Sequence, residues 1–170
     1  MVKKIFLFVL LINSLFSIVY AQTDSITSYT KKSYMIPMRD GVKLFTVVLT
    51  PTQQIRPNPF LLERTPYGAD IPLDENANIP LAEMGGLQAY AKEGYIFVFQ
   101  DLRGKFKSEG TFEMTRPLYH LIDKNRTDES TDSYDAIDWL VKNIPHNNGR
   151  AGIQGVSYPG YLALYAAVDP

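Results

Sequence analysis

Short apolar runs separated by turn residues make up much of the chain. Residues 34–37 and 43–50 are two such runs, and the Asp-Gly pair that begins at Asp40 between them is a strong hairpin signal. Residues 60–64 and 95–99 are two further runs. The second is apolar on both faces, as in a strand at the middle of a sheet that helices cover on both sides. The pattern therefore predicts an opening β-hairpin followed by buried strands.

Helical spacing of apolar residues appears between these strands. Residues 81–92 and 131–144 each place apolar residues on one side of a helix, and the second segment has Ser130 or Thr131 as its expected N-cap. Residues 102–130 between the two are polar and lack periodicity. Loops of this length are uncommon in compact domains and are often functional.

The alternation continues to the end of the chain. Residues 151–154 are expected to form a short strand, and residues 158–168 a helix rich in small residues. Strands that alternate with helices after the hairpin indicate an α/β fold, namely a parallel sheet with helices on both faces.

The N-terminus has the pattern of a signal peptide. Residues 1–21 comprise a short basic region, an apolar region and small residues before the expected cleavage after Ala21. The alternative is an uncleaved membrane anchor, but the apolar run is short for a span of about 20 residues. We expect a secreted or periplasmic protein, with an extended polar segment at 22–33 and one domain at 34–170.

Composition narrows the function classes. The net charge is −1 and the basic residues are scattered, unlike those of a nucleic-acid binder. The absence of cysteine excludes thiolate metal sites and a cysteine nucleophile. We expect no cofactor, no metal, no nucleic acid, and no membrane contact after signal cleavage. The number of subunits stays open, homo-oligomers included.

A serine motif lies between the last predicted strand and helix. Residues 155–160 read Gly-Val-Ser-Tyr-Pro-Gly, a variant of G-x-S-x-G in which the last glycine comes one position late. In such motifs the serine is on a strained strand-to-helix turn that exposes its Oγ. Ser157 is therefore the candidate nucleophile, and the N–H of Tyr158 is a candidate oxyanion donor. The alternative is a Gly-Ser turn without chemistry.

The catalytic base is not expected in this chain. In α/β-hydrolases the acid and then the histidine follow the serine, whereas only Asp169 and no histidine follow Ser157. His120 and His146 precede the serine, and neither is expected to be the base. We therefore interpret the chain as an N-terminal fragment that is inactive alone.

Other polar clusters are weaker candidates. The aspartates at 132, 135 and 138 could share a helix face as a cation site, but a solvated helix front is the preferred interpretation. The segment starting at Asp123 lacks the glycine and the glutamate of a calcium loop. Asp101 and Arg103 are expected to form a buried ion pair that fixes their loop, or else to border the active site.

Several motifs in order resemble one family. They are residues 35–44, the Arg-Thr-Pro-Tyr turn at 64–67, residues 99–104 with 108–110, residues 138–140, and the serine motif. This set resembles the X-Pro dipeptidyl-peptidase family, whose members include cocaine-esterase-type hydrolases. Within it the chain is most similar to the α-amino acid ester hydrolases and cephalosporin acylases.

The resemblance implies a function and site residues. Ser157 would form an acyl-enzyme with a small-molecule or short-peptide substrate, and the Tyr158 N–H and the Tyr67 hydroxyl would bind the oxyanion. The leading hypothesis is an exported ester or amide hydrolase of the α-amino acid ester hydrolase or acylase type. One alternative is an Xaa-Pro dipeptidyl-peptidase. Another, from a different class, is a non-catalytic binding domain on a hydrolase scaffold.

Overall fold

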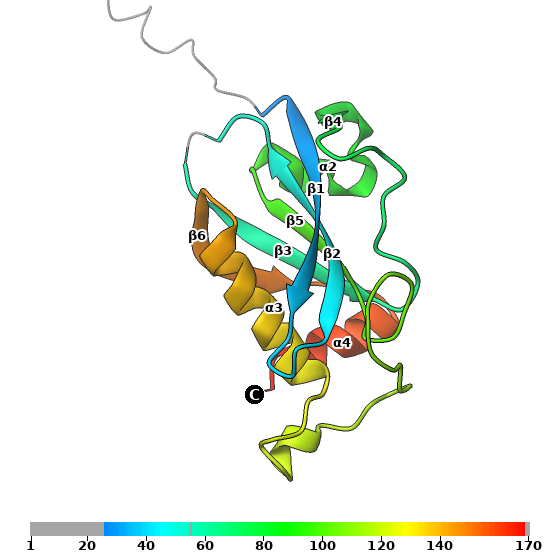
Figure 1. The fold of residues 1–170 in the computed structure, drawn as a ribbon. Coiled ribbons are helices and arrows are strands. Elements are labelled where there is room, and N and C mark those ends of the chain that lie inside the picture. The colour runs from blue at the N-terminus through cyan, green and yellow to red at the C-terminus, as the bar shows by residue number, and fades with distance from the viewer. Residues whose placement is uncertain (1–25, 55, 169–170) are drawn as a thin grey trace, which may run out of the picture.

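A six-stranded mixed sheet forms the centre of the computed structural model, which describes residues 26–54 and 56–168 (Figure 1). The strand order is β4-β1-β2-β5-β3-β6. The strands are β1 (Ser28–Pro37), β2 (Lys43–Pro51), β3 (Asn58–Thr65), β4 (Asn78–Pro80), β5 (Ile96–Asp101) and β6 (Asn147–Ile153). The predicted signal peptide lies outside the described residues.

The sheet has an antiparallel half and a parallel half. Strands β1 and β2 form the predicted hairpin, and β1 also pairs with β4 in the antiparallel sense. Strand β2 joins β5 antiparallel, whereas β5, β3 and β6 run parallel to one another. The expected parallel sheet is therefore confirmed only for these three strands. Residues 28–33, expected as part of a polar extended segment, form the first part of β1, where residues 29–33 pair with β2.

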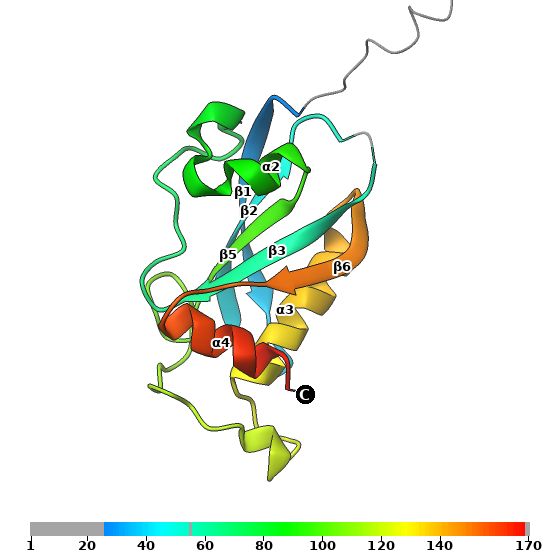
Figure 2. The same cartoon turned by 180° about the vertical axis from the view of Figure 1, so that it is seen from behind.

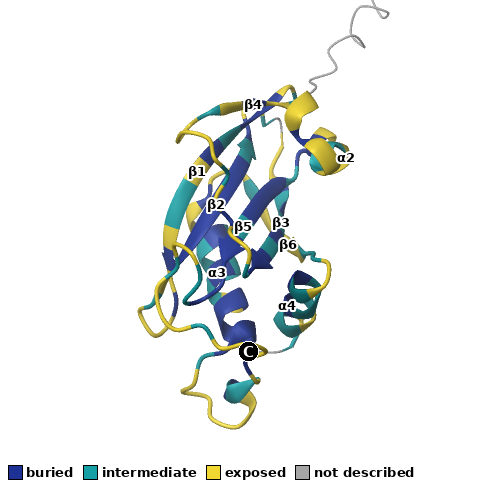
Figure 3. Ribbon diagram, turned by 90° about the vertical axis from the view of Figure 1, so that its right-hand side faces the viewer, coloured by how far each residue is buried: buried dark blue, intermediate teal, exposed yellow. Residues whose placement is uncertain are grey.

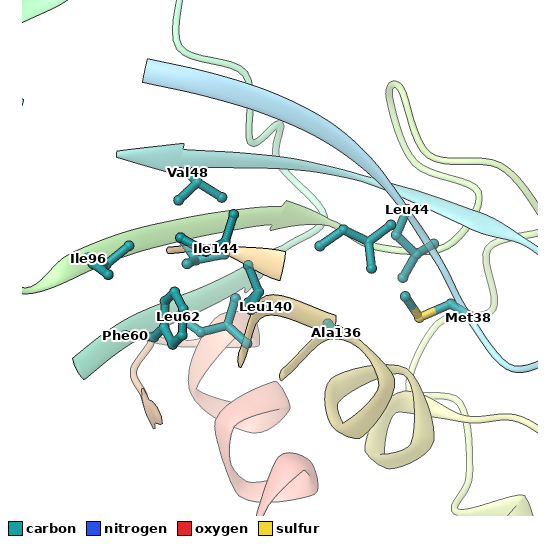
Figure 4. Close-up of a cluster of buried hydrophobic side chains, with 11 residues drawn as sticks. Met38, Leu44, Val48, Phe60, Leu62, Ile96, Ala136, Leu140 and Ile144 are labelled. Carbon is teal, nitrogen blue, oxygen red and sulfur yellow. The ribbon is translucent and has the colours of Figure 1, made fainter. Parts of the chain in front are cut away.

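Helices cover both faces of the sheet. Helix α3 (Glu129–Asn143) packs Ala136 and Leu140 against one face, which includes Phe60 and Leu62 of β3 (Figure 4). The opposite face is covered by α2 (Gln88–Lys92) and two 3-10 turns, η1 (Leu81–Glu83) and η2 (Gly85–Leu87). The single helix predicted for 81–92 is thus broken, and Gly85 is positioned at the break with a φ of +53°.

The N-cap of α3 differs from the prediction. Asp128, rather than Ser130 or Thr131, caps the helix, and its carboxylate accepts hydrogen bonds from the Ser130 and Thr131 N–H groups at 3.0 and 3.1 Å. The Thr131 hydroxyl in turn accepts from the Asp128 N–H at 2.8 Å. This capping box starts the helix at Glu129, and the whole first turn of the helix is buried.

Burial differs strongly between the central strands and the outermost strand β6. Strands β2 and β5 are almost entirely buried, whereas most of β6 is exposed (Figure 3). Strand β6 also begins four residues before the predicted strand, because residues 147–150 continue its backbone instead of only ending α3. Helix α4 (Tyr158–Ala166) follows β6 directly (Figure 2).

The loop from Leu102 to Asp128 contains one regular element, the 3-10 turn η3 (Tyr119–Leu121). Within the described residues, no helix has the length and apolar character needed to cross a membrane. In the same part of the chain, no three His, Cys, Asp or Glu residues are grouped as a metal site.

Candidate active site

Ser157 occupies a strained turn between β6 and α4. Its φ is +59° and its ψ is −123°, a conformation that costs free energy for a residue with a Cβ. The residue is exposed and is the N-cap of α4, but its side chain makes no capping hydrogen bond. Such a turn presents a serine Oγ at the edge of the sheet where the parallel strands β3, β5 and β6 end, as a nucleophile requires.

Gly155 makes this turn sterically feasible. A Cβ at position 155 would lie 2.3 Å from the carbonyl carbon of Pro159 and 2.4 Å from its oxygen. The backbone of the new helix therefore passes directly over Gly155. A Cβ on Gly160 would be 3.1 Å from the Gly155 oxygen, which is also tight. The close approach involves positions 155, 159 and 160, so the displaced last glycine still serves the turn.

The start of α4 directs N–H groups toward the sheet edge. The N–H of Tyr161 donates to the Ser157 carbonyl at 3.0 Å, and this bond closes the first helical turn. The N–H groups that precede it lack an intrahelical acceptor, as in any α-helix, and Pro159 has none. The Tyr158 N–H is the nearest of them to Ser157 in sequence, and the helix dipole adds positive potential there.

Tyr67 lies at the same edge of the sheet as Ser157. Strand β3 carries Tyr67 just beyond its end, β6 carries Ser157 just beyond its own, and the two strands are adjacent and parallel with Leu62 opposite Ile153. The Tyr67 N–H donates to the Thr65 Oγ1 at 3.1 Å, and the side chain is 66% exposed. The structure thus brings the three sequence-predicted site residues to one edge.

Asp101 joins two loops at this edge instead of pairing with Arg103. One carboxylate oxygen accepts from the Ala69 N–H at 2.6 Å, and the other from the Lys107 N–H at 3.2 Å. Burial raises the pKa of Asp101, although both hydrogen bonds oppose the shift. The expected Asp101–Arg103 ion pair is therefore wrong, because Arg103 points to Asp132 and Asp40. Asp101 fixes the loop after β3 to the loop after β5.

Asp132 is the centre of a buried charge cluster. Its carboxylate accepts from Arg103 Nη2 at 2.6 Å and from Arg116 Nη2 at 2.7 Å, and Arg64 Nη2 is 3.8 Å away. Burial would raise the pKa of Asp132, but the Arg103 hydrogen bonds and the arginine charges outweigh it and lower that pKa. The interpretation of a solvated helix front is therefore wrong for Asp132, which is fully buried. The cluster attaches the long loop to α3.

The two histidines lie away from Ser157. His120 Nδ1 is 2.5 Å from the Asp128 carboxylate, at the N-terminus of α3. At this same end of α3, the Ser130 Oγ donates to the carbonyl of Val168, which follows the C-terminus of α4. The nine residues of α4 make the helix about 13 Å long at 1.5 Å per residue, and Ser157 is at its other end. His146 precedes β6, a seven-residue strand roughly 23 Å long, whereas Ser157 follows it. Neither histidine is placed to be the base.

Three proteins are similar to the chain over 79–86% of its length. Cocaine esterase from Rhodococcus sp. (strain MB1 Bresler) is 33% identical over 136 residues. The crystal structure of an aminopeptidase from a marine sediment Thaumarchaeota archaeon is 42% identical with a TM-score of 0.71. An α-amino acid ester hydrolase structure is 41% identical, also with a TM-score of 0.71.

The mixed sheet and its serine turn define the N-terminal part of an α/β-hydrolase. The family model described as X-Pro dipeptidyl-peptidase (S15 family) matches residues 40–170. The chain belongs to this family of serine hydrolases. It spans 20% of the cocaine esterase and 24% of each of the two solved relatives.

Proposed function

We propose that Ser157 is the nucleophile of an acyl hydrolase that cleaves an ester or amide bond through an acyl-enzyme. The strained Ser157 turn, closed over Gly155 at the end of β6, is the observation that carries this proposal. A non-catalytic domain would gain nothing from maintaining such strain at an exposed serine, because the strain costs stability.

The proposed reaction proceeds in two halves. The Ser157 Oγ attacks the substrate carbonyl carbon and loses its proton to a base, and the carbonyl oxygen becomes an oxyanion. The Tyr158 N–H and the Tyr67 hydroxyl donate to this oxyanion. The alcohol or amine then leaves with a proton, and water hydrolyses the Ser157 ester to release the acid. Since His120 and His146 are remote, the base would come from sequence beyond this chain.

The substrate class is proposed from the relatives. The α-amino acid ester hydrolase and aminopeptidase relatives, at 41% and 42% identity, favour a substrate whose acyl part is an α-amino acid. The second candidate is an Xaa-Pro dipeptidyl-peptidase, which the description of the family favours. Comparing hydrolysis of phenylglycine methyl ester with that of Gly-Pro-4-nitroanilide separates the two.

A serine-directed fluorophosphonate tests the nucleophile. The test uses the full-length protein, by which we mean this chain together with whatever its reading frame encodes after Pro170. We expect labelling of the wild type and none of Ser157→Ala, with Ser130→Ala as the matched control because Ser130 is buried at the start of α3. Labelling that persists in Ser157→Ala would remove this residue from the mechanism. A wild type that neither labels nor hydrolyses would favour the binding-domain alternative.

We also propose that the protein is exported to the periplasm or the medium. The support is the N-terminal pattern of basic, apolar and small residues over 1–21. N-terminal sequencing of the protein after expression in its host is expected to begin at Gln22. A mature protein that still begins at Met1 contradicts cleavage.

A further inference from the structure

Backbone strain is concentrated at the edge that carries Ser157. Among the described residues, five other than glycine have a positive φ, and Phe106, Thr115 and Ser157 are three of them, at +46°, +50° and +59°. Phe106 and Thr115 belong to the loop that follows β5, and β5 runs parallel to β3 and ends opposite it at the same edge. Clustered strain of this kind is typical of functional sites.

Four large apolar side chains of this loop are open to solvent among the described residues, and two of them, Phe106 and Met114, precede η3. Phe106 is 67% exposed and Met114 is 70% exposed. For Phe106 the exposure coincides with strain, so within the described residues this phenylalanine keeps an unfavourable conformation without gaining from burial of its ring. A single exposed apolar residue is ordinary, but an exposed ring on a strained backbone calls for a functional explanation.

The loop that carries these two side chains contacts the residues of both proposed oxyanion donors. The Phe106 ring lies beside Gly68, next in sequence to Tyr67, since a Cβ on Gly68 would be 3.4 Å from Phe106 Cε1. On the other side, the N–H of Thr115, the residue that follows Met114, donates to the side-chain hydroxyl of Tyr158 at 2.9 Å. The loop thus contacts the neighbourhood of each donor separately.

The part of the loop from Arg103 to Arg116 is anchored at both ends. Arg103 and Arg116 both hydrogen-bond to the buried carboxylate of Asp132, at 2.6 and 2.7 Å. Lys107 lies between these two arginines and directly after Phe106, and its N–H donates to the Asp101 carboxylate. These contacts hold the loop in position, so that its apolar side chains form a fixed surface.

We propose that Phe106 and Met114 form the apolar surface against which the acyl group of the substrate packs while Ser157 is acylated. The inference rests on the proposed acyl hydrolase function and adds the residues that select the acyl group. It predicts a preference for acyl groups that carry an aromatic or a bulky aliphatic side chain over acetyl groups.

The test compares two esters that differ only in the acyl group. We would measure kcat/KM of the full-length protein for 4-nitrophenyl phenylacetate and 4-nitrophenyl acetate and follow the ratio of the two values. Phe106→Asn removes the ring while asparagine accepts a positive φ, and Met114→Gln replaces the thioether with a polar group of similar length. Each variant is expected to lower the ratio roughly tenfold, because a lost apolar contact changes discrimination by about this factor or more.

Ile122→Gln is the matched control, since Ile122 is exposed and apolar in the same loop but follows η3. It should leave the ratio unchanged. Variants at 106 and 114 that keep the wild-type ratio, or that lower only the thermal unfolding midpoint, would overturn the inference and indicate a packing surface. Failure of the proposed function is distinguishable, since the wild type would then show no fluorophosphonate labelling and no hydrolysis of either ester.

Discussion

The carboxylate of Asp132 and the guanidinium of Arg103 form a paired hydrogen bond inside the protein, at 2.6 and 3.1 Å. Arg103 lies in the loop after β5, and Asp132 lies in the first turn of α3. The contact therefore joins two elements through residues that are 29 positions apart in sequence. Arg103 also reaches Asp40, in the turn between β1 and β2, at 2.7 Å. One arginine therefore connects the hairpin, the edge loop and the helix.

Removing the charge of Asp132 should destabilise the full-length protein strongly. In Asp132→Asn, Arg103 and Arg116 would remain buried without their shared carboxylate, and breaking a buried pair typically costs about 3–5 kcal/mol. The free energy of unfolding from urea titration measures the effect. Asp138→Asn is the control, because Asp138 forms an exposed pair with Lys142 that should contribute little to stability. Equal effects of the two variants would contradict a central role for the buried cluster.

The Asp132 carboxylate should also make the stability of the fold change with pH in the acidic range. The pKa of Asp132 is lowered in the folded state, as is that of Asp128 despite its burial, because the His120 backbone and side chain donate to it. Groups of this kind stabilise the fold above their unfolded pKa of about 3.9, and the contribution is lost as the pH falls through the lower folded value. Urea midpoints between neutral pH and about pH 3 should fall steeply for the wild type and less steeply for Asp132→Asn. Parallel curves would show that Asp132 does not titrate in this way.

The sequence predicted the elements of this fold better than its contacts. The hairpin, the buried strand β5 and the serine turn follow from local patterns of apolar residues and glycine. The antiparallel pairing of β2 with β5 and the existence of β4 do not, because strand partners distant in sequence leave no periodic signal. Asp132 was misjudged for a related reason, since its partners Arg103 and Arg116 lie in a loop without regular spacing.

The site residues show the same division. The serine motif identified Ser157 and Gly155, and the family resemblance identified Tyr67. Phe106 and Met114 could not be identified, since nothing in a polar, aperiodic segment marks one apolar residue as functional. The strain at Phe106 and the exposure of both side chains are visible only in three dimensions.

A methyl group at position 155 should disrupt the nucleophile turn. In Gly155→Ala the new Cβ would lie 2.3 Å from the Pro159 carbonyl carbon, so either α4 must shift or the turn must open. We expect loss of fluorophosphonate labelling and a destabilisation of about 1–3 kcal/mol or more from overpacking. Gly86→Ala is the matched control, because its Cβ would meet no atom within 4 Å. Normal labelling of Gly155→Ala would show that the turn tolerates the displacement and that its tight geometry is unnecessary.

Loss of the Tyr67 hydroxyl should slow the reaction while the fold stays intact. Tyr67→Phe removes one proposed oxyanion donor and keeps the ring, and loss of such a donor typically lowers kcat by about 10²–10³. Because the side chain is exposed and the backbone N–H makes the hydrogen bond to Thr65, the thermal unfolding midpoint should stay the same. Tyr90→Phe on α2 is the control, since Tyr90 is also exposed but packs against Tyr95 at the opposite end of β5. The oxyanion acquires its charge only in the transition state, so kcat should fall far more than KM rises. A rise in KM with unchanged kcat would instead place Tyr67 in substrate binding and leave the Tyr158 N–H as the donor to the oxyanion.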